Sequence, residues 1–247
     1  MLLAIDIGNT NINFALFRNK KLAERFILST EDYNFGRLRS RIKSNTINDV
    51  IICSVVPQVT ERIKKDVSRL LGKKPYIIGK DIKVPIKNLY RKPRQVGQDR
   101  LVNAYAGVSL YGFPLIVIDY GTAVTFDVIS GRKEYIGGMI LPGLQISLET
   151  LVKKAALLPK IKLKKPRGLI GRDTVNSMLS GIVYGFAAMT DNLIVRIKKR
   201  IGSSAQVVAT GGNIALIKKY CRQIQRIDFD LTLKGLNLIY RERLYNK

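Results

Sequence analysis

Apolar residues in the first part of the chain form short runs that are separated by turn-forming residues. Leu2–Ile7 is almost continuously apolar, which is typical of a strand that is buried on both faces. Residues 12–17 and 22–28 have the character of a second and a third strand, and a turn at Arg18–Lys21 separates them. Residues 50–54 and 76–78 are two further short apolar runs. The pattern therefore predicts five strands, of which the first three follow one another directly.

Helical spacing appears between and after these runs. The apolar residues Val59, Ile63, Val67 and Leu70 lie three or four positions apart, and Gly72 is a residue that commonly ends a helix. Residues 101–110 predict a second helix, which follows the segment Gly-Gln-Asp-Arg at 97–100.

The same order restarts after residue 114. Residues 115–119, 123–129 and 134–140 predict three consecutive strands, and residues 206–210 predict a buried strand that ends at Gly211-Gly212. Between them, one face of a long helix carries six apolar residues three or four positions apart: Met178, Ile182, Phe186, Met189, Leu193 and Ile197. We therefore predict an α/β fold with two similar domains, residues 1–112 and residues 113–247.

A short acidic turn occurs once in each half, between the first and the second strand. The sequences are IDIGNTN at Ile5–Asn11 and IDYGTAVT at Ile118–Thr125. Glycine lets the backbone approach a ligand closely, and the amides and small polar side chains around it can donate hydrogen bonds to phosphate. An aspartate beside bound phosphate indicates Mg²⁺ between the two anions. Asp and Gly are also common in ordinary hairpins, but two copies after matching strands favour a pair of turns that bind a nucleoside triphosphate.

A third segment, VVATGGN at Val207–Asn213, is a buried strand that ends in Thr-Gly-Gly and offers an open backbone surface to a nucleoside. Strand–Gly-Gly–helix junctions are frequent, so this segment gains meaning only beside the two turns. The chain contains neither a G-x-x-x-x-G-K-[ST] loop nor a G-x-G-x-x-G motif.

The amino-acid composition limits which side chains could perform catalysis or bind metal. The chain of 247 residues has no histidine, so other side chains would have to perform any general acid–base catalysis. Cys53 and Cys221 are not spaced as metal ligands and indicate free thiols in a reducing compartment. No apolar stretch is obviously long enough to span a membrane, and Met1–Thr10 is unlike a signal peptide, so we expect a cytoplasmic protein without a membrane partner.

Positive charge is in large excess, with 43 Lys and Arg against 18 Asp and Glu. This excess is compatible with phosphate-rich partners or with a merely solvated basic surface. The densest cluster, Lys160–Arg167, has no aromatic residue for base stacking and is typical of a loop, so a nucleic-acid partner is not favoured.

The three motifs DIGNTN, DYGTAVT and ATGGN resemble the phosphate and adenosine motifs of the actin, sugar-kinase and heat-shock-chaperone ATPase superfamily. Within it, the chain resembles the type III pantothenate kinases, through the segments SVVPQVT, VGQDRLVNA, GGMILPGLQISLETL, AALLP, GRDTVNSMLSGIVYG and LTLKGLNLIY. Gln98 stands where that family usually has alanine. The resemblance implies two ribonuclease-H-like domains with a cleft between them, each a mixed sheet that opens with three antiparallel strands flanked by helices.

The resemblance also implies the activity: transfer of the γ-phosphoryl group of ATP to pantothenate, which gives 4′-phosphopantothenate in the first step of coenzyme A synthesis. It implies a homodimer that requires Mg²⁺ and a monovalent cation, K⁺ or NH₄⁺. Asp99 is the expected general base. The expected ATP contacts are Asp6, Ile7, Gly8, Asn9, Thr10, Asn11, Gly121, Thr122, Gly211 and Gly212. The expected pantothenate contacts are Tyr90, Gly97, Gln98, Arg100 and Thr174, and the expected metal ligands are Asp119 for the monovalent cation and Asp6 for Mg²⁺, directly or through water.

Some of these residues also have purely structural interpretations. Asp99 could pair with Arg100 or cap the helix that follows, and Thr174 stands where a helix cap is expected. At the level of the whole chain, two other functions remain open. One is an ATPase that switches conformation without an acceptor substrate, and the other is a nucleic-acid-binding transcriptional accessory factor.

Overall fold

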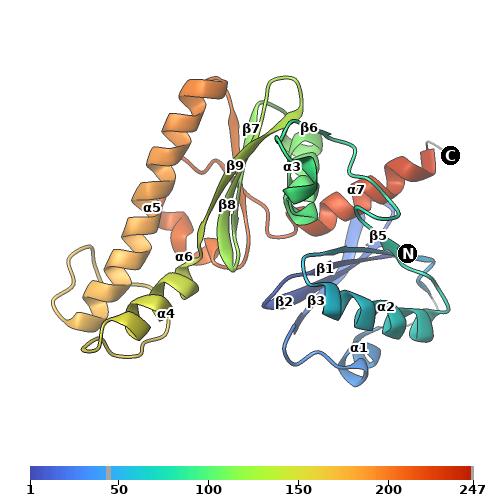
Figure 1. The fold of residues 1–247 in the computed structure, drawn as a ribbon, viewed down its shortest axis with the longest axis horizontal. Coiled ribbons are helices and arrows are strands. Elements are labelled where there is room, and N and C mark those ends of the chain that lie inside the picture. The colour runs from blue at the N-terminus through green and yellow to red at the C-terminus, as the bar shows by residue number, and fades with distance from the viewer. Residues whose placement is uncertain (43–45, 246–247) are drawn as a thin grey trace. The chain divides into compact units, whose positions relative to one another are not determined.

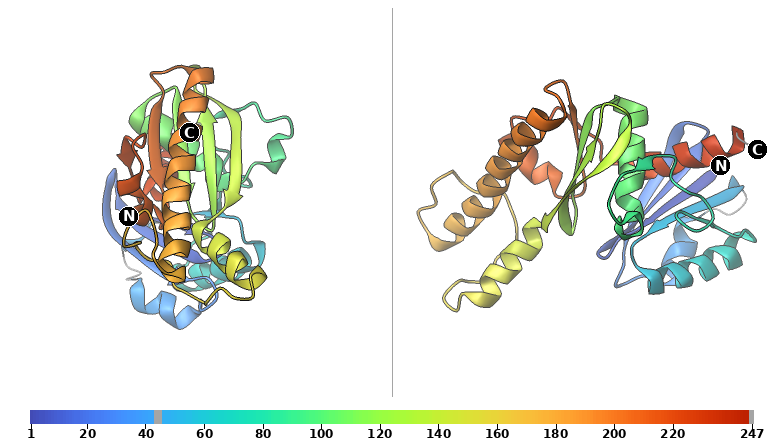
Figure 2. Two further views of the ribbon diagram at one scale, coloured as in Figure 1. Left: turned by 90° about the vertical axis from the view of Figure 1, so that its left-hand side faces the viewer. Right: turned by 45° about the horizontal axis from the view of Figure 1, so that its top comes forward.

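The computed structural model describes residues 1–42 and 46–245, and these residues divide into two units. The first unit comprises Met1–Ser109 together with Asp230–Lys247, and the second comprises Leu110–Phe229. The sequence assigned all of residues 113–247 to the second domain. The C-terminal helix α7 (Leu231–Tyr245) instead belongs to the first unit, because it packs against strands β1, β2 and β4. Figures 1 and 2 show the fold.

The sheet of the first unit contains β1 (Leu2–Ile7), β2 (Asn11–Arg18), β3 (Lys21–Ser29), β4 (Asp49–Ser54) and β5 (Tyr76–Ile77). Their order across the sheet is β3-β2-β1-β4-β5. The first three strands are antiparallel neighbours, and β4 and β5 continue in parallel from β1. The five strands predicted from the apolar runs are therefore confirmed, with ends that differ by at most one residue.

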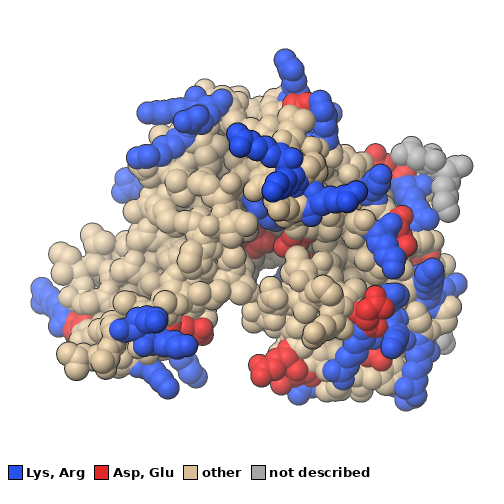
Figure 3. All heavy atoms as spheres, in the orientation of Figure 1, with Lys and Arg blue, Asp and Glu red and all other residues tan. Residues whose placement is uncertain are grey.

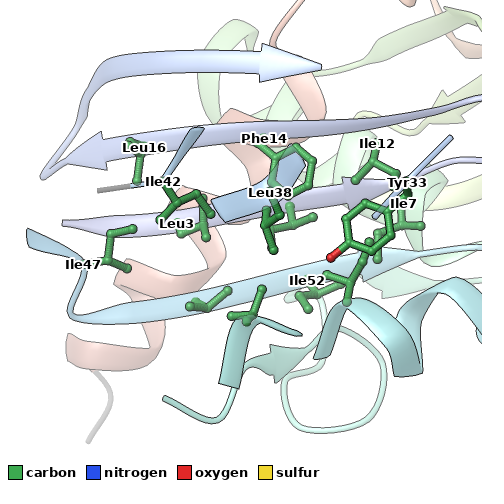
Figure 4. Close-up of a cluster of buried hydrophobic side chains, with 14 residues drawn as sticks. Leu3, Ile7, Ile12, Phe14, Leu16, Tyr33, Leu38, Ile42, Ile47 and Ile52 are labelled. Carbon is green, nitrogen blue, oxygen red and sulfur yellow. The ribbon is translucent and has the colours of Figure 1, made fainter. Parts of the chain in front are cut away.

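Alternation along β1 sends successive side chains to opposite faces of this sheet. Leu3, Ile5 and Ile7 face the helices α1 (Phe35–Arg41) and α2 (Pro57–Leu71), in the cluster drawn in Figure 4. Leu2 and Ala4 face the other way, toward α7 and the helix α3 (Gln98–Tyr111). Asp6 has the same parity as Leu2 and Ala4, so its carboxylate lies on the α3 side.

The helices of the first unit end and pack as their sequences dictate. Helix α2 stops at Gly72, whose φ of 64° is the left-handed conformation expected of a helix-ending glycine. Helix α7 approaches α3 at Gly235, where a Cβ atom would lie 2.9 Å from the carbonyl oxygen of Val102. The side chain of Thr232 donates to Asn103 Oδ1 at 2.7 Å, which joins the same two helices. Two short elements, β6 (Lys87–Asn88) and a 3₁₀ turn at Pro93–Gln95, precede α3.

The second unit repeats the order of the first. Strands β7 (Leu115–Tyr120), β8 (Ala123–Ile129) and β9 (Glu134–Pro142) form the antiparallel part, and β10 (Gln206–Thr210) and β11 (Arg226–Ile227) continue in parallel from β7. The remaining elements are α4 (Leu144–Lys154), α5 (Thr174–Ile201), α6 (Ile214–Ile217) and η3 (Lys218–Tyr220). Helices α5 and α6 pack on one face of the sheet, against residues such as Ile118, Phe126 and Val207 (Figure 1).

Helix α5 is the one described helix that is long and apolar enough, by length and composition alone, to span a membrane. This differs from the expectation that no stretch reaches that length. Its residues Leu179, Val183, Ala187 and Ile194 are buried in the core of the second unit. Such packing is that of the core helix of a globular unit.

Candidate functional site

The first acidic turn joins β1 to β2 and is closed by backbone hydrogen bonds. The amide of Gly8 donates to the carbonyl oxygen of Asn11 at 2.9 Å, and a Cβ atom on Gly8 would lie only 3.1 Å from that oxygen. Asn9, Thr10 and Asn11 are exposed at the tip, whereas the side chain of Ile7 is fully buried, which leaves only its backbone to a ligand. Thr30 fastens the turn, since its hydroxyl donates to the Gly8 carbonyl at 2.8 Å and its amide to that of Thr10 at 2.9 Å.

Asp6 lies at the C-terminal end of β1, beside polar residues of both neighbouring strands. Its register partners are Asn13 on β2 and Cys53 on β4. Asn13 Nδ2 donates to Asp6 Oδ2 at 3.2 Å. Burial, and secondly the negative charge of Asp99, raise the pKa of Asp6 from 3.8 to about 7, while the hydrogen bond from Asn13 opposes this rise. The two carboxylates that the sequence singled out in this unit therefore interact in the folded protein.

Asp99 lies in the first turn of α3. Its Oδ1 accepts a hydrogen bond from the backbone amide of Arg100 at 2.9 Å, and the same oxygen fills the space that a side chain on Gly97 would need. Burial raises the pKa of Asp99, although its hydrogen bond with the Arg100 amide and the charge of Arg100 act in the opposite direction. Asp99 is thus the second residue of the helix and bonds the next amide, which is not the pattern of a helix cap, and its carboxylate lies within electrostatic reach of Asp6.

The other expected pantothenate residues of this unit lie beside Asp99 or in the loop before it. Arg100 is 8% exposed, and Gln98 and Gly97 are half-buried. Tyr90 is also half-buried, and its amide donates to Asn88 Oδ1 at 2.9 Å. Asn88 Nδ2 in turn donates to the carbonyl oxygen of Pro93 at 3.3 Å, so a residue that the sequence did not single out organises this loop.

The second acidic turn joins β7 to β8 and is shorter than the first, because β8 begins at Ala123, directly after Gly121 and Thr122. The amide of Gly121 donates to the carbonyl oxygen of Ala123 at 3.1 Å, and the amide of Gly143 donates to that of Thr122 at 3.1 Å. A side chain at Gly143 would collide with the carbonyl oxygens of this turn, which explains the glycine of the segment Leu141-Pro-Gly. Thr125, counted among the possible phosphate donors, lies within β8 and donates to Asp127 Oδ2 at 3.2 Å.

The Thr-Gly-Gly segment meets this second turn because β10 and β7 are parallel neighbours whose C-terminal ends share one edge, with Thr210 opposite Asp119. Gly211 has a φ of 90°, and a Cβ atom there would lie 2.5 Å from Asp119 Oδ1 and 2.6 Å from the backbone nitrogen of Tyr120. Asn213 donates through its backbone amide to the Tyr120 carbonyl at 3.1 Å and through Nδ2 to that of Gly121 at 3.4 Å. The structure thus brings Asp119, Gly121 and Gly211 together, whereas Thr122 and Gly212 are exposed beside them.

Thr174 begins helix α5 but does not cap it. Asp173 is the capping residue, since its carboxylate accepts hydrogen bonds from the amide of Asn176 at 2.8 Å and from Asn176 Nδ2 at 2.6 Å. The possibility that Thr174 caps this helix is therefore wrong, and its exposed hydroxyl has no part in the start of α5. Burial raises the pKa values of both thiols, Cys53 and Cys221, which disfavours a thiolate nucleophile.

Several contributing residues lay outside the sequence prediction: Asn13, Thr30, Asn88 and Gly143. Asn13 carried a usable signal, since it is a polar residue at a strand position directly opposite Asp6 once the hairpin is assumed. Asn88 likewise makes a local contact, since it accepts from the amide two residues later, as Asn commonly does in turns. Thr30 instead acts on Gly8 and Thr10, which no local pattern could indicate.

The strand order in both units and the glycine-bearing turns at the strand ends define the actin and sugar-kinase class of α/β folds. A Clostridium difficile structure, the activator of 2-hydroxyisocaproyl-CoA dehydratase with bound ADPNP, aligns with a TM-score of 0.56 at 11% identity and covers 100% of this chain and 97% of its own. A Campylobacter jejuni structure, provisionally assigned to the Baf family of transcriptional activators, aligns with a TM-score of 0.62 at 19% identity, over 98% and 99% of the two chains. At these identities the likeness concerns the fold alone.

Sequence similarity identifies the family, which the structural similarity does not. The model of the type III pantothenate kinase family matches residues 2–196. The type III pantothenate kinase of Geotalea uraniireducens is 40% identical over 252 residues, which cover 98% of this chain and 98% of the relative. The chain belongs to the type III pantothenate kinase family.

Proposed function

We propose that this protein transfers the γ-phosphoryl group of ATP to the terminal hydroxyl of pantothenate and so forms 4′-phosphopantothenate, the first step of coenzyme A synthesis. The observation that carries the proposal is identity of about 40% to curated pantothenate kinases over nearly the whole chain. The chemistry of the site also supports the proposal, because Asp6 and Asp99 interact beside the first acidic turn, which can bind phosphate.

Asp99 is the general base in this proposal. As the hydroxyl oxygen of pantothenate attacks the γ-phosphorus, its proton passes to the Asp99 carboxylate, and the bond from the γ-phosphorus to the bridging oxygen of ADP breaks. A carboxylate whose pKa is raised by burial accepts a proton more readily than an exposed one. The hydrogen bond from the Arg100 amide to Oδ1 orients the group, which leaves Oδ2 for the substrate.

The first turn and Asp6 would hold the phosphates and Mg²⁺. Amides and hydroxyls of Gly8, Asn9 and Thr10 supply donors without introducing negative charge. The residues present fit Mg²⁺: Asp6 is a buried carboxylate whose pKa is raised further by the charge of Asp99, which favours a bound cation, and Mg²⁺ is usually held by one or two carboxylates together with substrate phosphates. Among the described residues no group of three or more His, Cys, Asp and Glu could hold a metal by itself, which suits an ion that arrives with ATP. When bound, Mg²⁺ would neutralise charge on the phosphates.

In the second unit, Gly121 and Thr122 would contact phosphate, and Gly211 and Gly212 the nucleoside. The carboxylate of Asp119 lies against Gly211 and Gly121 at the strand edge, where an oxygen ligand suits a K⁺ or NH₄⁺ ion. Because a side chain on Gly211 would occupy the position of Asp119 Oδ1, the absence of a side chain there is required for this arrangement.

Pantothenate carries a carboxylate, and a buried guanidinium is the side chain best suited to bind one in two-point contact. Arg100 would perform this role, together with Tyr90 and the exposed hydroxyl of Thr174. Gly97 directly precedes α3 and Gln98 is its first residue, so both border the start of the helix that carries Asp99 and Arg100.

We expect a cytoplasmic homodimer. Support for self-association comes from exposed apolar side chains between α4 and α5, where Leu157 is 95% and Ile170 83% exposed, since large apolar residues of this kind tend to lie at interfaces. Cys53 and Cys221 are both free, as is usual in a reducing compartment.

The test is a coupled assay of ADP release with purified protein and Mg·ATP, with and without pantothenate, and with K⁺ or a bulky organic cation as the counter-ion. The proposal predicts ADP release that depends on pantothenate and is stimulated by K⁺. Equal release without pantothenate would instead indicate a conformational ATPase. Absence of turnover, combined with tight duplex-DNA binding that ATP does not displace, would favour an accessory factor of transcription.

A further inference from the structure

The side chain of Gln98 lies flat against the backbone of Gly79. A Cβ atom on Gly79 would lie 2.7 Å from Gln98 Cδ, 2.9 Å from Oε1 and 3.0 Å from Cγ. The first two distances are shorter than real Cβ contacts, so a residue larger than glycine at position 79 would have to displace the carboxamide. Alanine at position 98, the usual residue in the family, would be too short to make this contact.

Gly79 belongs to a turn with a dense network of hydrogen bonds at the end of β5. Its amide donates to the carbonyl oxygen of Ile82 at 2.8 Å, and the amide of Asp81 donates to that of Ile77 at 2.8 Å. In return, Asp81 Oδ2 accepts from the amide of Ile77 at 2.9 Å. Gly79 itself has a φ of 83°, which glycine adopts without strain. The turn is therefore a rigid surface for whatever packs on it.

Gln98 is the first residue of α3, and Asp99 is the second. The Asp99 carboxylate is held locally, by the Arg100 amide and by close packing over Gly97, so its position follows the path of this first helical turn. Further along α3, the contacts of Val102 with Gly235 and of Asn103 with Thr232 fix the helix body against α7. Contact between Gln98 and Gly79 does the same for the end of the helix that carries the base.

We propose that Gln98 is a positioning residue, which packs on Gly79 and so fixes Asp99 where it must receive the proton of the substrate hydroxyl. This inference rests on the proposed function. It differs from a direct contact between Gln98 and pantothenate, because a positioning residue changes the rate of the chemical step, whereas a substrate contact changes binding. The contact requires both glutamine at position 98 and glycine at position 79.

The experiment compares Gln98→Ala with Gln98→Met, which keeps the unbranched length of the side chain and loses only the carboxamide. Removing the contact in Gln98→Ala is expected to lower kcat about 10-fold, since small displacements of a catalytic group have effects of that order or larger, while KM for pantothenate stays within about twofold. Gln98→Met should lose clearly less activity. Amide hydrogen exchange should increase in the first turn of α3 in Gln98→Ala and not in Gln98→Met.

A double-mutant cycle adds a second arm. In the wild-type background Gly79→Ala displaces the carboxamide, but in the Gln98→Ala background the space is already empty, so the two effects on kcat should be strongly non-additive. Unchanged kcat in Gln98→Ala, additive effects in the cycle, or a raised KM at normal kcat would each overturn the inference while leaving the proposed function standing. A wild-type protein without pantothenate-dependent turnover would overturn both.

Discussion

At the scale of single residues, the fold controls the protonation of two carboxylates, Asp6 and Asp99. Asp6 and Asp99 come from a strand end and a helix start that are far apart in the sequence, and the alternation of β1 places Asp6 on the face toward α3. Each carboxylate has a raised pKa, and burial is the largest cause in both. Such a pair suits a site that takes up a cation and accepts a proton.

This arrangement predicts an unusual pH dependence of stability in the absence of Mg²⁺. Since the pKa of Asp6 is raised from 3.8 to about 7 on folding, the folded protein holds a proton between these values that the unfolded chain has released. The stabilisation is therefore present at low pH and is lost as the pH rises through about 7. Compared with wild type, Asp6→Asn should have a flatter dependence of the unfolding free energy on pH between about 5 and 7.5, by at most about 1.4 kcal/mol per pH unit.

Chemical denaturation at several pH values, in buffers that contain EDTA, measures this difference. Asp32→Asn, which changes a carboxylate with a side chain that is 62% exposed, is the matched control and should follow the wild-type curve. Parallel curves for wild type and Asp6→Asn would refute the raised pKa.

At the scale of elements, the second turn and the Thr-Gly-Gly segment form one structural unit because β7 and β10 are parallel neighbours. Gly211 makes this possible, as its positive φ and its closeness to the Tyr120 backbone exclude a side chain. At the next residue, Gly212, an added Cβ atom would meet no other atom within 4 Å, and the φ angle is not in the left-handed region. Gly211 therefore cannot carry a side chain without strain, whereas Gly212 has room for one.

We predict that Gly211→Ala lowers the free energy of unfolding by about 1–3 kcal/mol or more, from backbone strain and from displacement of Asp119. Gly212→Ala, its neighbour and control, should leave the unfolding free energy within about 0.5 kcal/mol of wild type. Thermal unfolding of both variants compares them directly. Equal effects of the two substitutions would contradict the described packing of Gly211.

Some helices and strands could be predicted from the sequence, and others could not. Strands β1 and β10 were predicted with the ends that the structure has, because short, mainly apolar runs that are followed directly by glycine leave few alternatives. Helices α1, α4 and α7 were not predicted. Helix α7 illustrates the physical reason: it packs through Gly235 against α3, so its burial depends on residues more than a hundred positions earlier and leaves a weak periodic pattern.

Likewise, only some residues of the candidate site could be predicted from the sequence. Residues of the acidic turns could be named because glycine and aspartate at a strand end have few structural explanations when they occur twice. The roles of Thr30 and Gly143 could not, since each donates to a backbone carbonyl of a distant segment. The contact between Gln98 and Gly79 likewise exists only in three dimensions.

At the scale of the whole molecule, the excess of 43 basic over 18 acidic residues is the dominant property. Lys and Arg side chains are spread over both units on the face drawn in Figure 3, and acidic side chains are fewer. ATP and pantothenate are both anions, so a basic surface should increase the rate of encounter.

This predicts that kcat/KM for pantothenate falls several-fold when ionic strength rises from about 0.02 to about 0.3 M, because screening shortens the range of attraction. The added salt should be tetramethylammonium chloride at constant K⁺, so that activation by K⁺ does not confound the result. Steady-state kinetics at each ionic strength gives kcat as an internal control, which should change little. If kcat/KM does not depend on salt, the basic surface has no part in substrate capture.

The central claim is that Asp99 activates the hydroxyl of pantothenate for phosphorylation, and direct detection of the product by ³¹P NMR tests it. Wild-type protein with Mg·ATP and pantothenate should give a new phosphate monoester, and Asp99→Asn should give it at least about 100-fold more slowly while binding ATP with unchanged affinity. Asp32→Asn should behave as wild type. A wild-type sample that forms no phosphomonoester, or an Asp99→Asn variant that forms it at the normal rate, would contradict the account.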